Sequence, residues 1–534
     1  MSITTNKPNI DLKTQRYDRQ LRLWASSGQA ALESANVCLL NATATGCEVL
    51  KNLILPGIGN VTIVDDKLVD KHDIQSNFFL EPSDINSPKA QSVVHLLKEL
   101  NEAVETHFVQ KSPHDLLQHD PSFFSSFSLI VATNMHQTDI SRLATLCEES
   151  NKILITVSCK GLFGLFRIQA PDHTIIETHP ENVIDLRLTQ PFPQLMEYVK
   201  TFDLDALDQT DHAHVPFIVI LLIFVEKWKA EHDGKLPQSY AERNELKSLV
   251  QANMRTVDEE NFEEAISNIW RLSGGNNISS DVRSIFASDA CENLNGQSTY
   301  FWIIARAIRD FMNNEGQGQL PLSGKLPDMK SDTKNYVGLQ NAYRQKALED
   351  LKNVTLRVDA LLNKLDIPKD LLPNDAIDTF CKNAGHVKLI QFRSINEEIQ
   401  QPRATKIENL LSTDDNMTYY IIFQAADHFF TQHQRYPGEM METNDEQEVK
   451  LLKEQVIKTL QTMGINDCGL VDTILTKPMT NYIRFRNQET ANMAALMGGL
   501  VAQEAIKLIT RQYIPINNTC LFNGIASTSS VVDL

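Results

Sequence analysis

The chain has 534 residues, of which 42% are hydrophobic and 22% are charged. This is the composition of a soluble globular protein, and the length predicts two or three domains. The 50 Lys and Arg residues against 68 Asp and Glu residues give a formal net charge of −18. Such an acidic balance argues against a nucleic-acid-binding or anionic membrane surface and suits basic protein partners.

Neither a membrane span nor a secretory signal is predicted. The longest apolar run, residues 215–225, is far shorter than the roughly 20 residues of a membrane helix. The first 12 residues are polar and lack the apolar core of a signal peptide. We therefore expect a cytoplasmic protein, with a nuclear location also open. The eight cysteines form no C-x-x-C pair and no Cys/His cluster, so neither disulfides nor a metal site is expected.

The first patterned segment is Tyr17-Asp18-Arg19-Gln20-Leu21-Arg22-Leu23-Trp24. Its spacing predicts an amphipathic helix, with Leu21 and Trp24 facing the core and the two arginines in solvent.

A degenerate nucleotide-binding loop follows at residues 37–48, VCLLNATATGCE. In the intact loop, G-x-G-x-x-G, the three glycines make the turn, admit the pyrophosphate and allow close packing of helix on strand. Here Asn41 and Thr43 replace the first two glycines and only Gly46 remains. Because the Thr43 side chain fills space that a phosphate needs, we expect the chain to keep the fold without binding a nucleotide.

Short apolar runs then alternate with helical patterns up to residue 157. This alternation predicts an α/β fold, a doubly wound, Rossmann-like and mostly parallel sheet. The predicted strands are Val37–Leu40, Val61–Val64, Leu129–Ala132 and Ile153–Val157, and the predicted helices are Glu48–Leu55, Lys89–Asn101 and Ile140–Glu149.

After Pro171 the pattern becomes helical with little strand signal. We predict a first part of the sheet domain at residues 1–170, an all-helical insertion at 171–480 and a closing part at 481–534. In the closing part, a helix of small residues from Ala491 predicts close packing, and Tyr513–Asn523 predicts a hairpin that turns at Asn517-Asn518. The insertion's predicted helices are Val215–Glu231, Asn261–Leu272, Tyr300–Asn313, Asn335–Leu365, Met417–His433 and Glu446–Met463.

Several segments together resemble the adenylation domains, of ThiF-like fold, of enzymes that activate ubiquitin-like modifiers. They are Tyr17–Trp24, the degenerate loop, Val61–Asp66, Pro88–Ala90 and Gly498–Thr510. Other segments resemble the regulatory, non-catalytic subunits of heterodimeric activating enzymes for Nedd/Rub-type modifiers. They are Asn77–Leu80, Pro121–Phe124, Asp185–Leu188, Gly316–Pro321 and Pro327–Met329.

The resemblance implies which site residues are lost. Active members use the intact loop, an acidic residue after the second strand for the ribose, an arginine for phosphates and an aspartate for magnesium. Here the arginine position falls at Ser76. Asp65 either faces a ribose or lies at a solvated strand end, and we favour the solvated position. We therefore expect this chain to bind no cofactor itself, with ATP and Mg²⁺ bound in the partner subunit.

The resemblance also implies a function for Arg19. In this family the arginine of the Tyr-x-Arg-Gln-Leu segment reaches across the dimer interface to the triphosphate in the partner's site. A guanidinium suits this contact because it is permanently charged and binds phosphate oxygens in a fork. The alternative for Arg19 is an ordinary interface salt bridge.

Two further segments are predicted as partner surface by the same resemblance. One contains His212 and His214, which are too few to form a metal site. The other runs through Leu326, Pro327, Asp328 and Met329 to Tyr336. The alternative for both is an ordinary loop.

The sequence therefore predicts the regulatory subunit of an obligate heterodimer. Its expected partners are the catalytic subunit, the ubiquitin-like modifier and, through the complex, a conjugating enzyme. The alternatives are the small subunit of a SUMO-type activating enzyme, a self-sufficient nucleotide-binding enzyme of the adenylating or NAD-dependent kind, and a pure scaffold. An intact glycine loop would distinguish the self-sufficient enzymes, and Arg19 distinguishes the scaffold.

Overall fold

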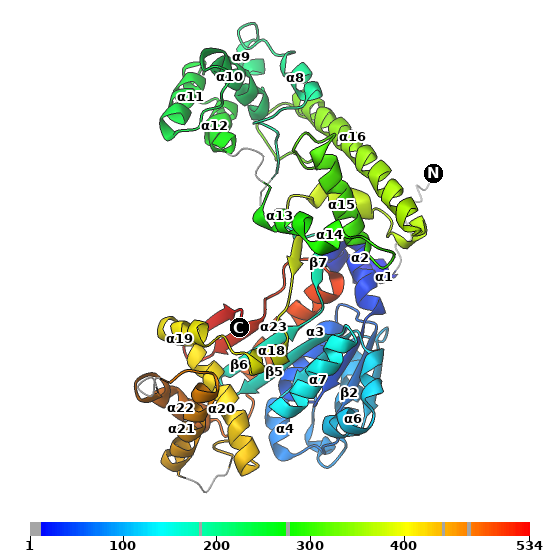
Figure 1. The fold of residues 1–534 in the computed structure, drawn as a ribbon, viewed down its shortest axis with the longest axis vertical. Coiled ribbons are helices and arrows are strands. Elements are labelled where there is room, and N and C mark those ends of the chain that lie inside the picture. Colours follow the sequence, from blue (N-terminus) through cyan, green and yellow to red (C-terminus); the bar gives the residue numbers. More distant parts are fainter. Residues whose placement is uncertain (1–11, 181–183, 274–277, 440–443, 467–470) are drawn as a thin grey trace, which may run out of the picture. The chain divides into compact units, whose positions relative to one another are not determined.

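The computed structural model describes residues 12–180, 184–273, 278–439, 444–466 and 471–534. The chain forms two compact units (Figure 1). One, which we call the sheet unit, consists of Met1–His173 and Ile390–Leu534; the other, the helical unit, is Thr174–Leu389. The sheet unit carries the α/β fold that the sequence predicts.

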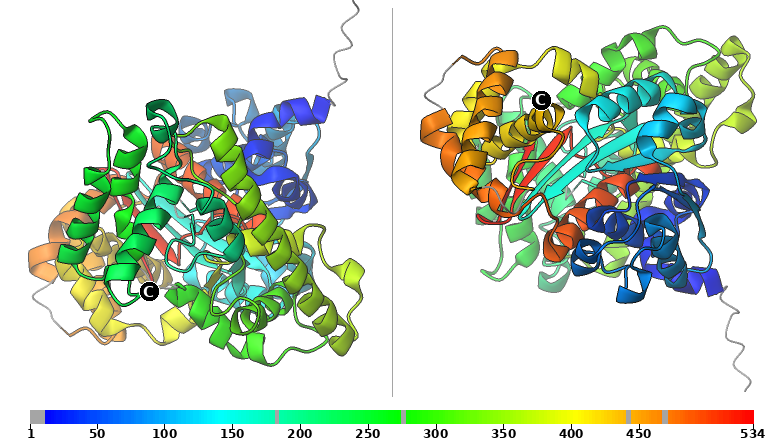
Figure 2. Two further views of the ribbon diagram at one scale, coloured as in Figure 1. Left: turned by 90° about the horizontal axis from the view of Figure 1, so that it is seen from above. Right: turned by 90° about the horizontal axis from the view of Figure 1, so that it is seen from below.

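A single eight-stranded sheet forms the centre of the sheet unit, in the order β10-β9-β6-β5-β4-β1-β2-β3. The strands from β3 to β5 are parallel, and β6, β9 and β10 continue the sheet antiparallel. Figure 2 shows the C-terminal strands, in red, beside the cyan strands of the first part. The strands are β1 (Asn36–Leu40), β2 (Asn60–Val64), β3 (Glu105–Val109), β4 (Leu129–Thr133), β5 (Ile153–Lys160), β6 (Phe163–Gln169), β9 (Thr519–Asn523) and β10 (Thr528–Val532).

Helices cover both faces of the parallel strands, which is why these strands are continuous apolar runs in the sequence. In β1, Val37 and Leu39 contribute to one core, and Cys38 and Leu40 contribute to the core on the opposite face. The first core includes α3 (Ala44–Ile54), α5 (Lys89–Leu100) and α23 (Ala491–Thr510), and the second includes α6 (Pro113–His119) and α7 (Gln137–Glu149).

The small residues of α23 allow the close packing that the sequence predicts. A Cβ on Gly498 would lie 2.5 Å from Glu48 Cβ, so any side chain there would push α23 away from α3. By length and composition α23 is also the one candidate membrane-spanning helix among the described residues, with 56% of its apolar window buried. Its buried side chains belong to the core shared with α3 and the sheet, which makes it a core helix.

The division of the helices differs from the predicted insertion at 171–480. Only residues up to Leu389 belong to the helical unit. Most of the helices after it pack on the antiparallel strands, in a core that includes Phe163 of β6 and Leu521 of β9, whereas the first of them contributes Ile395 to the core that contains α7. Helical periodicity does not reveal which surface a helix packs against, so the sequence could not locate this boundary. These helices are α18 (Ile395–Gln400), α19 (Ala404–Thr413), α20 (Met417–His433), α21 (Asp445–Thr462), the π-helical turn Val471–Leu475 and α22 (Thr476–Arg484).

The helical unit contains two cores that are joined by one long helix, α16 (Thr333–Leu365). Leu339 and Tyr343 of α16 lie in the first core, whereas Val354 and Val358 lie in the second. The other helices are α8 (Pro193–Val199), α9 (Gln209–His212), α10 (Phe217–Glu231), α11 (Tyr240–Ala252), α12 (Glu260–Ser267), α13 (Ser280–Ala287), α14 (Asp289–Glu292), α15 (Tyr300–Asn313) and α17 (Ala376–Asn383). The short strands β7 (His173–Ile175) and β8 (Lys388–Ile390) pair with each other.

The C-terminal hairpin turns at a different place from the predicted one. β9 and β10 pair around residues 524–527, where Ser527 has a φ of 54°. Asn517 and Asn518 precede β9, and neither has the positive φ that a type I′ turn needs. Instead Asn518 is buried, and its backbone N–H donates to Val532 O at 3.3 Å. The predicted turn was therefore wrong.

Candidate functional site

The degenerate loop forms an unstrained turn between β1 and α3. Asn41 takes the left-handed conformation with a φ of 65°, which asparagine tolerates better than most residues. Thr43 has an extended backbone (φ −72°, ψ 163°) and caps α3, since its hydroxyl accepts from the Gly46 N–H at 3.1 Å. The Thr43 position therefore needs no positive φ, and its side chain replaces an external ligand at the helix start.

Gly46 keeps the packing role predicted for the third glycine. A Cβ at this position would lie 2.7 Å from Leu39 Cδ1 and 3.2 Å from Thr133 Cγ2. The helix could not approach the strands so closely with any other residue here.

Most backbone N–H groups of the loop donate within the chain. Asn41 N–H donates to Val64 O at 3.0 Å, and Ala42 N–H donates to Asp65 Oδ2 at 2.8 Å. Thr45 N–H donates to Glu489 Oε2 at 3.1 Å. A nucleotide phosphate is normally bound by such N–H groups, and here it would first have to displace the protein's own acceptors.

The prediction that Asp65 lies at a solvated strand end was wrong. Its side chain is 1% exposed. Oδ2 accepts from Ala42 N–H, and Oδ1 accepts from Lys67 N–H at 2.8 Å. Burial is tolerated because both carboxylate oxygens are hydrogen-bonded. The carboxylate that would bind a ribose in an active relative fixes the loop here.

No free cation lies at the predicted arginine position among the described residues, because the lysine beside it is paired within the chain. Ser76, at the predicted arginine position, ends the short helix α4 (Lys71–Ser76). Lys89, at the start of α5, lies beside the same helix, and its Nζ is 2.7 Å from Asp73 Oδ1. This ammonium is therefore neutralised by a carboxylate of the chain.

Three residues of this site were missed by the sequence analysis. Thr133 Oγ1 donates toward Asn41 O at 2.8 Å, and Asn134 Nδ2 donates to Glu489 Oε1 at 2.9 Å. Thr133 and Asn134 directly follow a predicted strand, so the edge of the sheet could have been anticipated. Glu489 lies 444 residues after its partner Thr45, and no local pattern marks it.

Arg19, on α2 (Asp18–Ser34), is exposed, whereas nearby Tyr17 is buried. The Tyr17 ring is 4% exposed, and its hydroxyl accepts from Asn101 Nδ2 at 3.0 Å. Arg19 is exposed and makes no hydrogen bond or ion pair with any residue that the structure describes. By contrast, Arg22 pairs with Asp18 at 2.9 Å and Arg16 donates to Leu100 O at 3.4 Å. A buried tyrosine thus anchors the segment and leaves a free guanidinium on the surface.

The predicted partner surface of the helical unit is corrected at one position. His212 is 2% exposed, its Nδ1 lies 2.7 Å from Glu259 Oε1, and its ring stacks on Phe262. It therefore cannot contact a partner without unfolding this core. His214 and Asp328 are exposed, and the remaining predicted residues are partly buried: Leu326, Pro327, Met329 and Tyr336. Their contact with a partner stays a prediction.

The cysteines of the described residues are all buried and free. Burial raises the pKa of each thiol, for example that of Cys159 to about 12 and that of Cys291 to about 11. Such thiols are protonated at neutral pH and are poor nucleophiles. Cys468 lies outside the described residues. No group of His, Cys, Asp and Glu suited to a metal ion occurs in the described parts of the chain.

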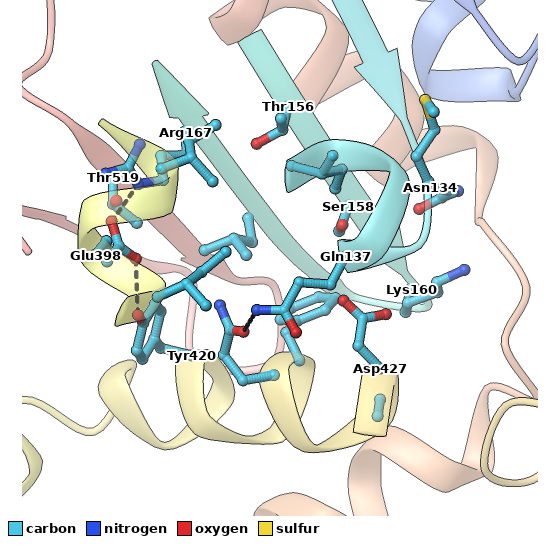
Figure 3. Close-up of a pocket in the computed structure, with 18 of the residues that line it drawn as sticks. Asn134, Gln137, Thr156, Ser158, Lys160, Arg167, Glu398, Tyr420, Asp427 and Thr519 are labelled. Atoms are coloured by element: carbon cyan, nitrogen blue, oxygen red, sulfur yellow. Dashed lines mark hydrogen bonds and ion pairs between the residues drawn. The ribbon is translucent and has the colours of Figure 1, made fainter. Parts of the chain in front are cut away.

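A small cavity of about 70 Å³ lies between the sheet and α20 (Figure 3). At one end Glu398 pairs with Arg167 and accepts from the Tyr420 hydroxyl at 2.8 Å. At the other end lie the Lys160 ammonium and the Asp427 carboxyl, which interact as groups of opposite charge. Burial raises the pKa of Asp427 to about 7 and lowers that of Lys160. At each end of the cavity an acidic group therefore lies near a basic one.

The chain is similar to known proteins over nearly its whole length. The ThiF family model matches residues 17–532. The "NEDD8-activating enzyme E1 regulatory subunit" of Xenopus laevis is 41% identical over 98% of this chain and 99% of its own length. The protein of the same name from Drosophila melanogaster is 37% identical, over 99% and 98%. The "NEDD8-activating enzyme E1 regulatory subunit AXR1" of Arabidopsis thaliana is 37% identical, over 98% and 97%.

Among solved structures, "Crystal structure of E. coli MccB + Succinimide" aligns at 17% identity over 33% of this chain and 53% of that chain, with a TM-score of 0.28. A similarity at this level carries no argument. The relatives and the family model are informative, because they cover the sheet unit and the helical unit alike. This chain therefore belongs to the ThiF family and, within it, to the family of NEDD8-activating enzyme E1 regulatory subunits.

Proposed function

We propose that this chain is the non-catalytic subunit of a heterodimer that activates a NEDD8-type modifier. The observation that carries the proposal is the closed loop: the N–H groups of Ala42, Thr45 and Gly46 are bound by Asp65, Glu489 and Thr43. A chain with these contacts has lost the means of binding a triphosphate while keeping the fold that binds one. The full-length similarity to regulatory subunits supports the same conclusion.

In this proposal the chemistry takes place in the catalytic subunit, which binds ATP and Mg²⁺. The C-terminal carboxylate of the modifier attacks the α-phosphate of ATP and releases pyrophosphate, which turns a poor leaving oxygen into a good one. A cysteine thiolate of the catalytic subunit then attacks the acyl carbon, releases AMP and forms a thioester, from which the modifier passes to a cysteine of a conjugating enzyme. Covalent catalysis of this kind divides one difficult acyl transfer into easier steps.

We assign Arg19 to that partner site. Its guanidinium is exposed and unpaired among the described residues, whereas Arg16 and Arg22 are bonded. An arginine that has no partner in the described part of the chain is available for a triphosphate across an interface, where its charge and its fork of donors suit phosphate oxygens. The buried Tyr17 side chain holds the start of α2, and therefore Arg19, at a fixed position on the surface.

ATP–pyrophosphate exchange by the purified chain, alone and mixed with a NEDD8-type catalytic subunit and modifier, tests the proposal. We expect no exchange by the chain alone and exchange in the mixture. Exchange by the chain alone would contradict the proposal, because it requires a working nucleotide site in this subunit. A mixture that is active with a SUMO-type modifier and inactive with a NEDD8-type one would contradict the assignment of the modifier.

A further inference from the structure

The start of α3 holds a carboxylate from a distant part of the chain. Glu489 lies in the linker between α22 and α23, and its Oε2 accepts from Thr45 N–H in the first turn of α3 at 3.1 Å. The first N–H groups of a helix have no acceptor inside the helix, and the helix dipole favours an anion beside them. Glu489 therefore occupies the kind of position at which a helix binds phosphate.

A second donor and a nearby cation complete the surroundings of this carboxylate. Asn134 Nδ2 donates to Glu489 Oε1 at 2.9 Å, while Asn134 Oδ1 accepts from Cys159 N–H at 3.1 Å. The buried Lys160 ammonium acts on Glu489 as an opposite charge. Burial raises the pKa of Glu489, and the Thr45 N–H and Lys160 act in the opposite direction.

One donor at the site is left over. The Thr45 hydroxyl belongs to a fully buried residue, and its Oγ1 has no hydrogen-bond partner of good geometry among the described residues. The same hydroxyl is close enough to Glu489 to lower the pKa of that carboxyl. Each oxygen of the Glu489 carboxylate already accepts one hydrogen bond, Oε2 from the Thr45 backbone N–H and Oε1 from the Asn134 side-chain amide. A tetrahedral oxyanion such as phosphate has additional oxygens for the hydroxyl.

The linker that carries Glu489 is fixed at two neighbouring points. Gly161 N–H donates to Gln488 O at 2.7 Å, and the Thr490 hydroxyl donates to Gly161 O at 2.8 Å. The Phe485 ring lies directly over Gly161, where a Cβ would come within 1.9 Å of it. The linker thus closes over the end of β5, with Glu489 pointing to the loop.

We propose that Glu489 is a permanent in-chain ligand of the anion site at the start of α3, and that it holds the 485–490 linker on the sheet without any nucleotide. The inference goes beyond the proposed function and does not depend on it, because every contact lies within this chain. It also identifies what an added oxyanion would have to replace: one carboxylate bound by Thr45 and Asn134.

Hydrogen exchange of the full chain, followed by mass spectrometry, tests this proposal. In Glu489→Ala the backbone amides of residues 43–47 should exchange about tenfold faster or more, as expected when a buried donor loses a charged acceptor. Inorganic phosphate should restore part of the protection in E489A, compared with chloride at equal ionic strength, and should change nothing in the wild type. Glu454→Ala, which removes an exposed carboxylate from α21, is the matched control and should behave as the wild type.

A second variant keeps the test decisive if E489A does not fold. Glu489→Gln retains an acceptor for Thr45 N–H without the charge, and we expect its amides to exchange faster than in the wild type by a smaller factor than in E489A. Exchange in E489Q equal to the wild type would overturn the proposal, because the negative charge would then be dispensable. Unchanged exchange in E489A, or no greater protection by phosphate than by chloride in that variant, would overturn it as well.

Discussion

The degenerate loop and the exposed start of α2 around Arg19 differ in whether their hydrogen-bond donors have partners within the described chain. At the loop, N–H groups that could bind a phosphate are satisfied by Asp65, Thr43 and Glu489. On α2, a guanidinium suited to phosphate has no partner among the described residues. If the loop has lost its nucleotide as we propose, more than two glycines changed, because its N–H donors now have acceptors within the chain, whereas the Arg19 guanidinium stays exposed.

Substitutions at the loop and at Arg19 should therefore affect different properties, stability in the first case and activity in the second. Contacts at the loop are buried and internal, so changing them should alter the free energy of unfolding of the chain. Arg19 contributes no described internal contact, so changing it should alter only what the heterodimer does. The following predictions test the two sides of this comparison.

The largest effect is expected on activity, from Arg19→Ala. A charge-assisted contact to phosphate contributes about 1.5–3 kcal/mol, which corresponds to a fall of roughly tenfold to a hundredfold in the adenylation rate of the heterodimer at low ATP. The melting temperature of the isolated chain should not change. Arg22→Ala removes a similarly exposed arginine of the same helix and is the control. Equal rates for R19A and the wild type would leave Arg19 as an ordinary surface residue.

A smaller effect, on stability instead of activity, is expected from Asp65→Ala. This change leaves the N–H groups of Ala42 and Lys67 without their acceptors. The Ala42 N–H is buried, and a buried unsatisfied donor costs about 1–3 kcal/mol, whereas Lys67 is exposed and water can replace its acceptor. The free energy of unfolding of the chain in urea should fall accordingly, with Asp65→Asn falling less because it keeps an acceptor oxygen. Heterodimers of the folded variant should adenylate at the wild-type rate. An unchanged urea midpoint would show that the loop does not depend on this carboxylate.

Two alanine substitutions at glycines should change stability in opposite directions, and the second of them has the smallest expected effect. In Gly46→Ala the methyl group meets Leu39 and Thr133, and such overpacking typically costs about 1–3 kcal/mol. In Gly499→Ala, by contrast, nothing lies within 4 Å of the new Cβ, and replacing a glycine inside a helix stabilises by roughly 0.5–1 kcal/mol. Melting temperatures of the isolated chain should move in opposite directions. A stabilised G46A would mean that α3 is not held tightly against β1.

Local patterns predicted four of the parallel strands, β1, β2, β4 and β5, because these are apolar runs, and they predicted the helices α3, α5 and α7 that pack on them. They did not predict β3, whose residues are largely exposed, or the turn after Asn523. The prediction for Asp65 was wrong because an aspartate at the end of a strand is usually exposed. The sequence does not show that N–H groups of Ala42 and Lys67 donate to this carboxylate in the fold. The role of Glu489 could not be predicted at all, since it depends on a contact between residues 444 positions apart.

The stoichiometry of ATP binding shows whether nucleotide is bound by the catalytic subunit alone. Equilibrium dialysis with radiolabelled ATP and Mg²⁺ should detect no binding to this chain alone and one ATP per heterodimer with the catalytic subunit. Binding to the chain alone, or two ATP molecules per heterodimer, would contradict the claim that the closed loop at residues 41–46 has given up its nucleotide.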